Sequence, residues 1–175
     1  MKSNIALIGF MGTGKTAVGR VLAQKLNRRF VELDALIEKK AGKSIPEIFR
    51  QDGEIVFREL EIAVTKEVAS GTNLVIACGG GIVLNRINID RLRQQGIIVY
   101  LTATPAVILK RVSSDSHRPL LEVADRAQTI RQLLKLRRPF YEAAADIKMD
   151  TTGLTIDSVA EEIISRLKEN EGFHL

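Results

Sequence analysis

Apolar and polar residues alternate along the chain in a pattern that indicates strands and helices in turn. Five short apolar runs, at residues 4–8, 29–33, 73–77, 97–102 and 147–149, are each bounded by polar or turn-forming residues. Such runs are typical of buried strands in a parallel sheet. The segments between them repeat apolar residues at the helical spacing of about 3.6 residues. This alternation predicts an α/β fold with a parallel sheet covered on both faces.

Two segments interrupt the alternation. About 34–70 holds two or three expected helices, too many for one crossover between strands, and Ser44 with Glu47 forms a capping box there. About 112–124 is polar, contains Pro119 and lacks a clean period. In a phosphate-transfer enzyme these positions suit an acceptor-binding insertion and a mobile lid. Surface decoration is the alternative for both, within one domain that spans residues 1–175.

Composition excludes several classes of protein. The 175 residues are 45% hydrophobic and 27% charged, as in ordinary globular proteins. The net charge of +5 comes from basic residues scattered among acids, so we expect no nucleic-acid partner. The single cysteine, Cys78, ends an apolar run and fits a core thiol in a reducing, cytoplasmic compartment. No run approaches the 18 or more apolar residues of a membrane span, and no extra apolar face suggests more than a monomer.

Residues 9–16 carry the most specific motif of the chain. They read Gly-Phe-Met-Gly-Thr-Gly-Lys-Thr and lie between an expected strand and an expected helix. This is the pattern G-x-x-x-x-G-K-[ST], whose backbone N–H groups surround nucleoside triphosphate phosphates. We expect Lys15 to reach the terminal phosphates and Thr16 to ligate magnesium. The predicted nucleotide-binding residues of this loop are Gly12, Thr13, Gly14, Lys15, Thr16 and Ala17. A glycine-rich turn in an ordinary βαβ unit is the alternative.

Ligands of open parallel sheets bind beyond the carboxyl ends of the strands, so the residues at those ends are candidates for the site. The third apolar run ends in Cys78 and glycines, without a carboxylate, whereas the second ends in Glu32-Leu33-Asp34. Residues two apart in an extended segment point to the same side, so both carboxylates would face one cleft. One would face hydrated magnesium and the other an acceptor hydroxyl. Alternatively, Asp34 only caps the next helix.

Glycines and arginines supply the remaining candidates. Gly79, Gly80 and Gly81 would let a ligand approach the backbone closely, unless they form only a flexible turn. The helix expected at 54–69 would bury Val56, Leu60, Val64 and Val68. Its opposite face would hold Arg58, Glu61 and Thr65, and a merely solvated Arg58 is the alternative.

Three more arginines, at two places in the chain, suit the binding of planar anions, because the guanidinium donates two parallel hydrogen bonds. Arg137 and Arg138 lie at the end of a long helix, which we expect to stop at Pro139. Arg118 lies in the expected lid and would close over the transferring phosphate.

Together these motifs resemble the shikimate kinases. The matching elements occur in order along almost the whole chain: the phosphate loop, Asp34, Ile48-Phe49…Gly53-Glu54…Phe57-Arg58…Glu61, Gly79-Gly80-Gly81, Arg118-Pro119-Leu-Leu and Arg137-x-Pro-x-Tyr141. The phosphate loop alone fits many families, whereas the combination is far more specific.

The resemblance implies ATP-dependent phosphorylation of the shikimate 3-hydroxyl, with one Mg²⁺ per subunit, on the way to chorismate and the aromatic amino acids. It also implies a P-loop NTPase fold of the nucleoside-monophosphate-kinase type: three layers and a five-stranded parallel sheet in the order 2-3-1-4-5. By the family's pattern, Arg58 and Arg137 hold the shikimate carboxylate and Asp34 engages its ring hydroxyls. The other implied roles are substrate contact at Gly80 and Gly81, orientation of Arg58 by Glu61, a pocket lining of Phe49 and Phe57, closure of Arg118 on ATP, and packing of Arg111 beside adenine. The implied catalytic residues are Asp34, Lys15 and Arg118.

The chain departs from this family pattern at two places. Glu32 stands where the family usually has aspartate; it keeps the negative charge but is one methylene longer, and the resemblance implies that it contacts magnesium through water. The stretch 152–155 lacks a proline often found on the adenine side, and we assign no nucleotide contact there.

Two other functions remain open from the residues alone. One is a related kinase that acts on gluconate or on a nucleotide. The other is a nucleotide-dependent switch or nucleic-acid-binding module without acceptor turnover.

Overall fold

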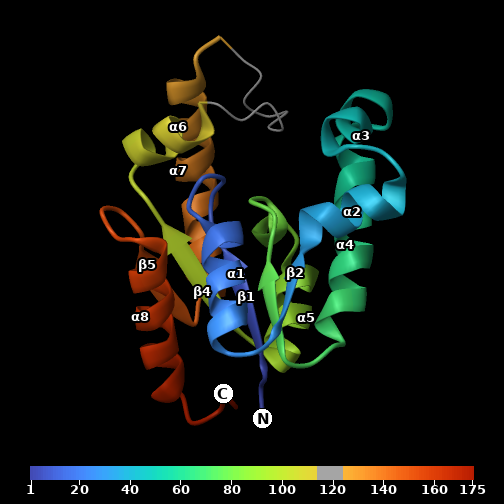
Figure 1. Cartoon of the computed structure of the whole chain (residues 1–175). Coiled ribbons are helices and arrows are strands. Elements are labelled where there is room, and N and C mark those ends of the chain that lie inside the picture. Colours follow the sequence, from blue (N-terminus) through green and yellow to red (C-terminus); the bar gives the residue numbers. More distant parts are fainter. Residues whose placement is uncertain (114–123) are drawn as a thin grey trace.

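The computed structural model describes residues 1–113 and 124–175, and its centre is a parallel sheet in the order β2-β3-β1-β4-β5 (Figure 1). The strands are β1 Asn4–Ile8, β2 Arg29–Glu32, β3 Leu74–Ala77, β4 Gly96–Thr102 and β5 Ile147–Asp150. All neighbouring strands pair in parallel. The predicted fold class and strand order are therefore confirmed.

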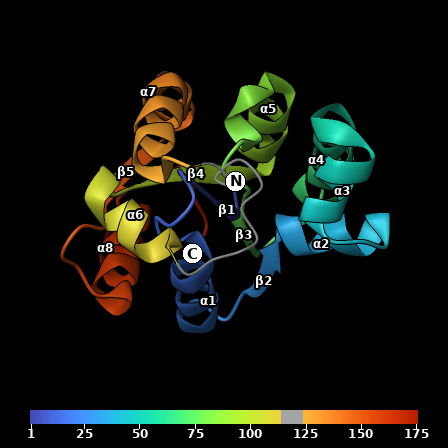
Figure 2. The same cartoon turned by 90° about the horizontal axis from the view of Figure 1, so that it is seen from above.

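Helices cover both faces of this sheet, as the view from above shows (Figure 2). Helices α1 (Lys15–Lys25) and α8 (Ile156–Lys168) lie on one face, and α5 (Arg86–Gln95) and α7 (Arg126–Ala144) lie on the other. Side chains of a strand alternate between the two faces. In β1, Ile5 and Leu7 accordingly join the apolar core under α1 and α8, whereas Ala6 and Ile8 join the opposite core.

The stretch between β2 and β3 forms three helices beside the β2 edge of the sheet (Figure 1). They are α2 Leu33–Ala41, α3 Ile45–Gln51 and α4 Gly53–Ala69. The predicted capping box starts α3, because the Ser44 hydroxyl accepts from the Glu47 N–H and the Glu47 carboxylate accepts from the Ser44 N–H. After β3 comes a short 3₁₀ turn, η1 (Ile82–Leu84), and after β4 comes α6 (Pro105–Val112).

The predicted faces of α4 were partly wrong. Val64 is buried, but Val56, Leu60 and Val68 are only half-buried. The opposite face, which was predicted to hold Arg58, Glu61 and Thr65, also buries Glu61 and Thr65, at 1% and 0% exposure. The reason is tertiary: α4 packs against α2 and α3 on one side and α5 on another, so its polar side also faces protein.

The predicted end of a helix at Pro139 was also wrong, because α7 continues through this proline to Ala144. A proline inside a helix removes one backbone hydrogen bond. Here Leu134, Arg137, Tyr141 and Ala144 continue one buried face across the proline, and this packing offsets the lost bond.

The two termini lie side by side at the end of the molecule away from the phosphate loop (Figure 1). Lys2 pairs with Phe173, and the His174 N–H donates to the Lys2 carbonyl over 2.8 Å. In the described part of the chain, no helix is long and apolar enough to cross a bilayer.

Candidate active site

The phosphate loop joins β1 to α1 and is shaped by its own backbone. Gly9 has φ 148°, and a Cβ there would lie 2.4 Å from the Leu101 carbonyl oxygen, so only glycine fits. Gly14 has φ 94° and directly precedes α1. The Lys15 ammonium donates to the Gly9 and Phe10 carbonyls over 2.8 and 2.9 Å. The lysine therefore lies across the loop, on the side where phosphates bind in this motif.

Thr16 and Glu32 meet beside this loop. The Thr16 hydroxyl donates to the Glu32 carboxylate over 3.0 Å, and Arg20 lies 3.9 Å from the other Glu32 oxygen. Hydroxyl and carboxylate oxygens are hard ligands of the kind magnesium prefers. Among the described residues, no group of three or more His, Cys, Asp or Glu could hold a metal. These residues thus fit a Mg²⁺ ion that also takes phosphate and water ligands.

Asp34 reaches the same cavity by a different route from the one predicted. Helix α2 begins at Leu33, so Glu32 ends the strand and Asp34 lies in the first helical turn. Glu32 and Asp34 therefore do not lie two apart in one extended segment, contrary to the prediction, and Asp34 is not the capping residue of α2 either. Both carboxylates nevertheless line one cavity of about 280 Å³, together with the phosphate loop, Arg111 and residues 77–80.

Gly79, Gly80 and Gly81 bring four charged side chains together. A Cβ on Gly79 would lie 2.7 Å from Asp34 Oδ1 and 3.3 Å from Glu61 Oε2. A Cβ on Gly80 would lie 3.6 Å from the Arg137 guanidinium, and one on Gly81 would lie 2.4 Å from that of Arg58. The glycines thus leave room for the binding side chains themselves, and not only for a ligand.

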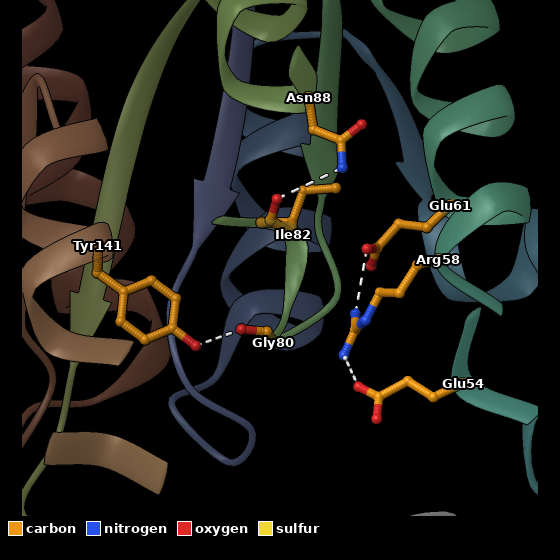
Figure 3. A network of polar contacts seen from close by, with 7 residues as sticks. All are labelled: Glu54, Arg58, Glu61, Gly80, Ile82, Asn88 and Tyr141. Atoms are coloured by element: carbon orange, nitrogen blue, oxygen red, sulfur yellow. Dashed lines mark hydrogen bonds and ion pairs between the residues drawn. The ribbon is translucent and has the colours of Figure 1, made fainter. Parts of the chain in front are cut away.

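Arg58 and Glu61 form a largely buried ion pair on α4. The Arg58 guanidinium donates to Glu61 over 3.1 Å and to Glu54 over 3.2 Å (Figure 3). Burial raises the pKa of Glu61, whereas the neighbouring Arg58 guanidinium lowers it. Within the described residues, Glu61 Oε2 and Arg58 Nε are buried without a hydrogen-bond partner. Arg58 is thus no solvated surface residue, and it retains a donor for a ligand.

The structure separates the two candidate arginines of α7. Arg137 is 5% exposed, lies beside Gly80 and packs with its guanidinium 5.9 Å from the Phe10 ring centroid. Arg138 is exposed, and its charge acts on Tyr100 instead. Only Arg137 therefore accompanies Asp34 and Arg58 around the glycines.

Comparisons with known proteins show to which family a chain with this site belongs. The sequence model of the family described as shikimate kinase matches residues 11–168. The chain belongs to the shikimate kinase family. It is 48% identical over 167 residues to a shikimate kinase of Pelotomaculum thermopropionicum, covering 95% of this chain and 96% of that protein. It is 50% identical over 161 residues to one of Caldanaerobacter subterraneus subsp. tengcongensis, covering 92% and 94%.

A solved structure agrees with this assignment. The shikimate kinase from Acinetobacter baumannii in complex with shikimate superposes with a TM-score of 0.94 at 40% identity, covering 98% of this chain and 96% of that chain. The predicted class of enzyme, a small-molecule kinase, is thereby confirmed.

Of the other residues that the shikimate kinase pattern singles out, Arg111 lines the same cavity, and Phe49 and Phe57 lie beside Arg58. Arg111 donates to the Gly12 carbonyl over 3.0 Å and to the Thr151 hydroxyl over 3.3 Å. The Phe49 and Phe57 rings pack 4.9 Å apart, and Phe57 also carries the Arg58 guanidinium over its face at 5.0 Å. Arg118 lies outside the described residues.

Two further residues of this shikimate kinase site are Cys78 and Tyr141. Cys78 is buried, so the predicted core location of its thiol is confirmed, and burial raises the pKa of this thiol. No separate role was predicted for Tyr141, which was only the last residue of the Arg137-x-Pro-x-Tyr141 motif. In the structure its hydroxyl donates to the Gly80 carbonyl (Figure 3). Its position four residues after Arg137 would have placed both on one face, had the helix been predicted to continue past Pro139.

Proposed function

We infer that this protein transfers the γ-phosphoryl group of ATP to the 3-hydroxyl of shikimate and releases shikimate 3-phosphate and ADP. Membership of the shikimate kinase family supports this reaction. The observation that carries it is the glycine segment, which gathers Asp34, Arg58 and Arg137 beside the phosphate loop. A small acceptor with one carboxylate and several hydroxyls matches two guanidinium groups and one carboxylate.

On the acceptor side, Arg58 and Arg137 hold the carboxylate, since a guanidinium fork matches a planar anion. Glu61 keeps Arg58 in place through the 3.1 Å ion pair. Phe49 and Phe57 line the pocket, and the Gly80 and Gly81 backbone contacts the ring. Asp34 orients the attacking hydroxyl and accepts its proton during transfer.

On the donor side, the loop from Gly12 to Ala17 binds the phosphates, Arg111 packs near the adenine, and Arg118 closes over the γ-phosphate. Lys15 neutralises charge that develops on the transferring group. Thr16 would hold the single Mg²⁺ that accompanies ATP, and Glu32 would assist it through water. When bound, this ion neutralises charge on the phosphates.

The domain organisation, the oligomeric state and the compartment belong to the same proposal. We propose one kinase domain over residues 1–175, with about 34–70 binding the acceptor and about 112–124 closing as a lid. The larger part of that lid lies outside the described residues. A monomer in the cytoplasm, without nucleic-acid or membrane partners, is the expected state.

A coupled assay for ADP release tests the reaction. It offers shikimate, gluconate and nucleoside monophosphates separately, each with ATP and Mg²⁺. We expect turnover with shikimate alone. Turnover with gluconate or a nucleotide in place of shikimate would establish a related kinase, and ATP binding without turnover on any acceptor would favour a nucleotide switch. In that last case, polynucleotide affinity measured against salt concentration would identify a nucleic-acid module.

A further inference from the structure

The segment that follows β3 is held in place at several points. The Cys78 N–H donates to the Leu7 carbonyl of β1 over 3.0 Å. Beyond the glycines, the Asn88 side chain donates to the Ile82 carbonyl over 3.4 Å (Figure 3). Between these two anchors, the Gly80 carbonyl accepts from the Tyr141 hydroxyl. The Ile82 N–H also donates to the Gly79 carbonyl over 3.2 Å, so Gly80–Gly81 is the central peptide of a turn. With glycines, such a turn admits either direction of its central peptide, so a contact from outside the turn is needed to select one.

Tyr141 is well suited to fix it. The side chain is fully buried, and its ring stacks on Tyr100 with centroids 5.0 Å apart and planes inclined by 20°. A carbonyl offers no proton, so the phenol must donate in this bond. Burial raises the pKa of Tyr141, and the nearby Arg137 guanidinium only partly opposes that shift, so the hydroxyl keeps its proton.

We propose that Tyr141 is a positioning residue for the acceptor, which fixes the Gly80–Gly81 peptide and its distance from Arg137. The inference deepens the proposed function and rests on it. Arg137 and Tyr141 lie one helical turn apart on α7, and both lie against Gly80. One helix thus carries the carboxylate-binding arginine and the group that holds the backbone beside it.

The direction of the bond has a further consequence. In a trans peptide, the C=O and the following N–H point in opposite directions. The Gly80 carbonyl points at Tyr141 of α7, so the Gly81 N–H points away from α7. Figure 3 shows Arg58 and Glu61 on that opposite side of Gly80. The hydrogen bond from Tyr141 therefore turns the Gly81 N–H toward the side of the segment on which Arg58 lies, where we expect the acceptor carboxylate to bind.

Tyr141→Phe removes the hydroxyl and keeps the stacked ring. We expect the KM for shikimate to rise about fivefold, the effect of losing one hydrogen bond, while kcat and the KM for ATP stay within about twofold of wild type. Tyr100→Phe is the matched control, because it removes the hydroxyl of the other ring in the same stack, whose neighbour is Arg138 and not Gly80. It should leave all three constants unchanged.

Three results would overturn the inference: an unchanged KM for shikimate in Tyr141→Phe, equal changes in Tyr100→Phe, or equal rises of both KM values. Wild-type protein that fails to phosphorylate shikimate would contradict the proposed function instead. A second measurement needs no variant. In wild-type protein, the Tyr141 hydroxyl proton should exchange slowly in NMR spectra and show contacts to the Gly80–Gly81 backbone, and rapid exchange would refute the hydrogen bond.

Discussion

The phosphate loop and the acceptor region meet at one cavity, which Asp34, Gly79 and Gly80 line from the acceptor side, but the two regions are built in different ways. The loop consists of contiguous residues, 9–16, and Lys15 and Thr13 hydrogen-bond to carbonyls of the loop itself. The acceptor region draws on four distant stretches of chain, represented by Asp34, Arg58, the glycines at 79–81 and Arg137. Its members meet only because α2, α4, β3 and α7 pack around one point. Substitutions in the acceptor region should therefore change acceptor binding and leave nucleotide binding intact, and substitutions at the loop should do the reverse.

The largest effect should come from the residue that stands between the two regions. Asp34→Asn keeps the shape of the side chain but removes the carboxylate that would accept the hydroxyl proton. We expect kcat to fall at least about 100-fold, since positioned acid–base groups contribute that much or more. The affinity for ATP, measured by calorimetry on the same protein, should stay near that of wild type. Near-normal turnover would remove Asp34 from the mechanism.

A methyl group at Gly81 should impair acceptor binding sterically and leave nucleotide binding unchanged. Gly81 has an ordinary φ of −98°, so alanine fits the backbone, but its Cβ would lie 2.4 Å from the Arg58 guanidinium. The Arg58 guanidinium must then move away from its present position. We expect the KM for shikimate to rise about 30-fold in Gly81→Ala, the loss of a charged hydrogen bond, with an unchanged KM for ATP.

The double variant provides the control for this change. If Gly81→Ala acts through Arg58, it should add almost nothing in an Arg58→Ala background, because the two changes remove the same interaction. Full additivity of the two effects would show that the methyl group acts elsewhere.

A smaller effect is expected on the phosphate side. Arg111 is exposed and donates to the Gly12 carbonyl and the Thr151 hydroxyl. Arg111→Ala should raise the KM for ATP about threefold, as for one exposed hydrogen-bonding group, and leave the KM for shikimate unchanged. A larger change for shikimate than for ATP in the steady-state assay would contradict the division between the regions.

The smallest effect concerns pH. Burial raises the pKa of Glu61 above its ordinary value of 4.5, although Arg58 and Arg137 oppose this shift and Asp34 adds to it. A raised pKa means that the folded state binds the proton more tightly, so stability falls as pH rises through the window above 4.5. Urea unfolding at a series of pH values should show this slope in wild type and not in Glu61→Gln.

The control for the pH series is Glu54→Gln. Glu54 is the other carboxylate partner of Arg58, and its side chain is 50% exposed. This variant therefore shows what the loss of an ion pair with Arg58 does when the lost carboxylate is not buried. Identical pH slopes in wild type and Glu61→Gln would show that the buried carboxylate carries no such linkage.

The same contrast explains what the sequence could predict. A contiguous loop with a fixed residue pattern is visible in one dimension, and the strand order followed from the family resemblance. The acceptor residues were candidates from their residue types and places in the chain, and the resemblance supplied their roles, but their surroundings were not predicted. The sequence left open whether Arg58 on the polar face of α4 was only solvated, whereas packing against α5 and the glycines buries Glu61 and Thr65 of that face.

Two local rules failed where tertiary contacts were stronger. Proline normally ends a helix, but the buried face of α7 continues across Pro139, and this placed Tyr141 beside Gly80. Glu32 and Asp34 were aligned by strand alternation, but the chain turns into α2 at Leu33. In both cases the local pattern was correct for an isolated segment, and the packing of distant elements decided the outcome.

Isothermal titration calorimetry of each variant with both ligands tests most directly whether the two regions bind their ligands separately. Wild-type protein, Lys15→Ala and Arg58→Ala are each titrated with ATP in the presence of Mg²⁺ and, separately, with shikimate. The account predicts heat from both ligands in wild type, loss of the ATP signal alone in Lys15→Ala, and loss of the shikimate signal alone in Arg58→Ala. If either variant lost both signals while remaining folded, or if Arg58→Ala bound shikimate as tightly as wild type, the proposed division of the site would be contradicted.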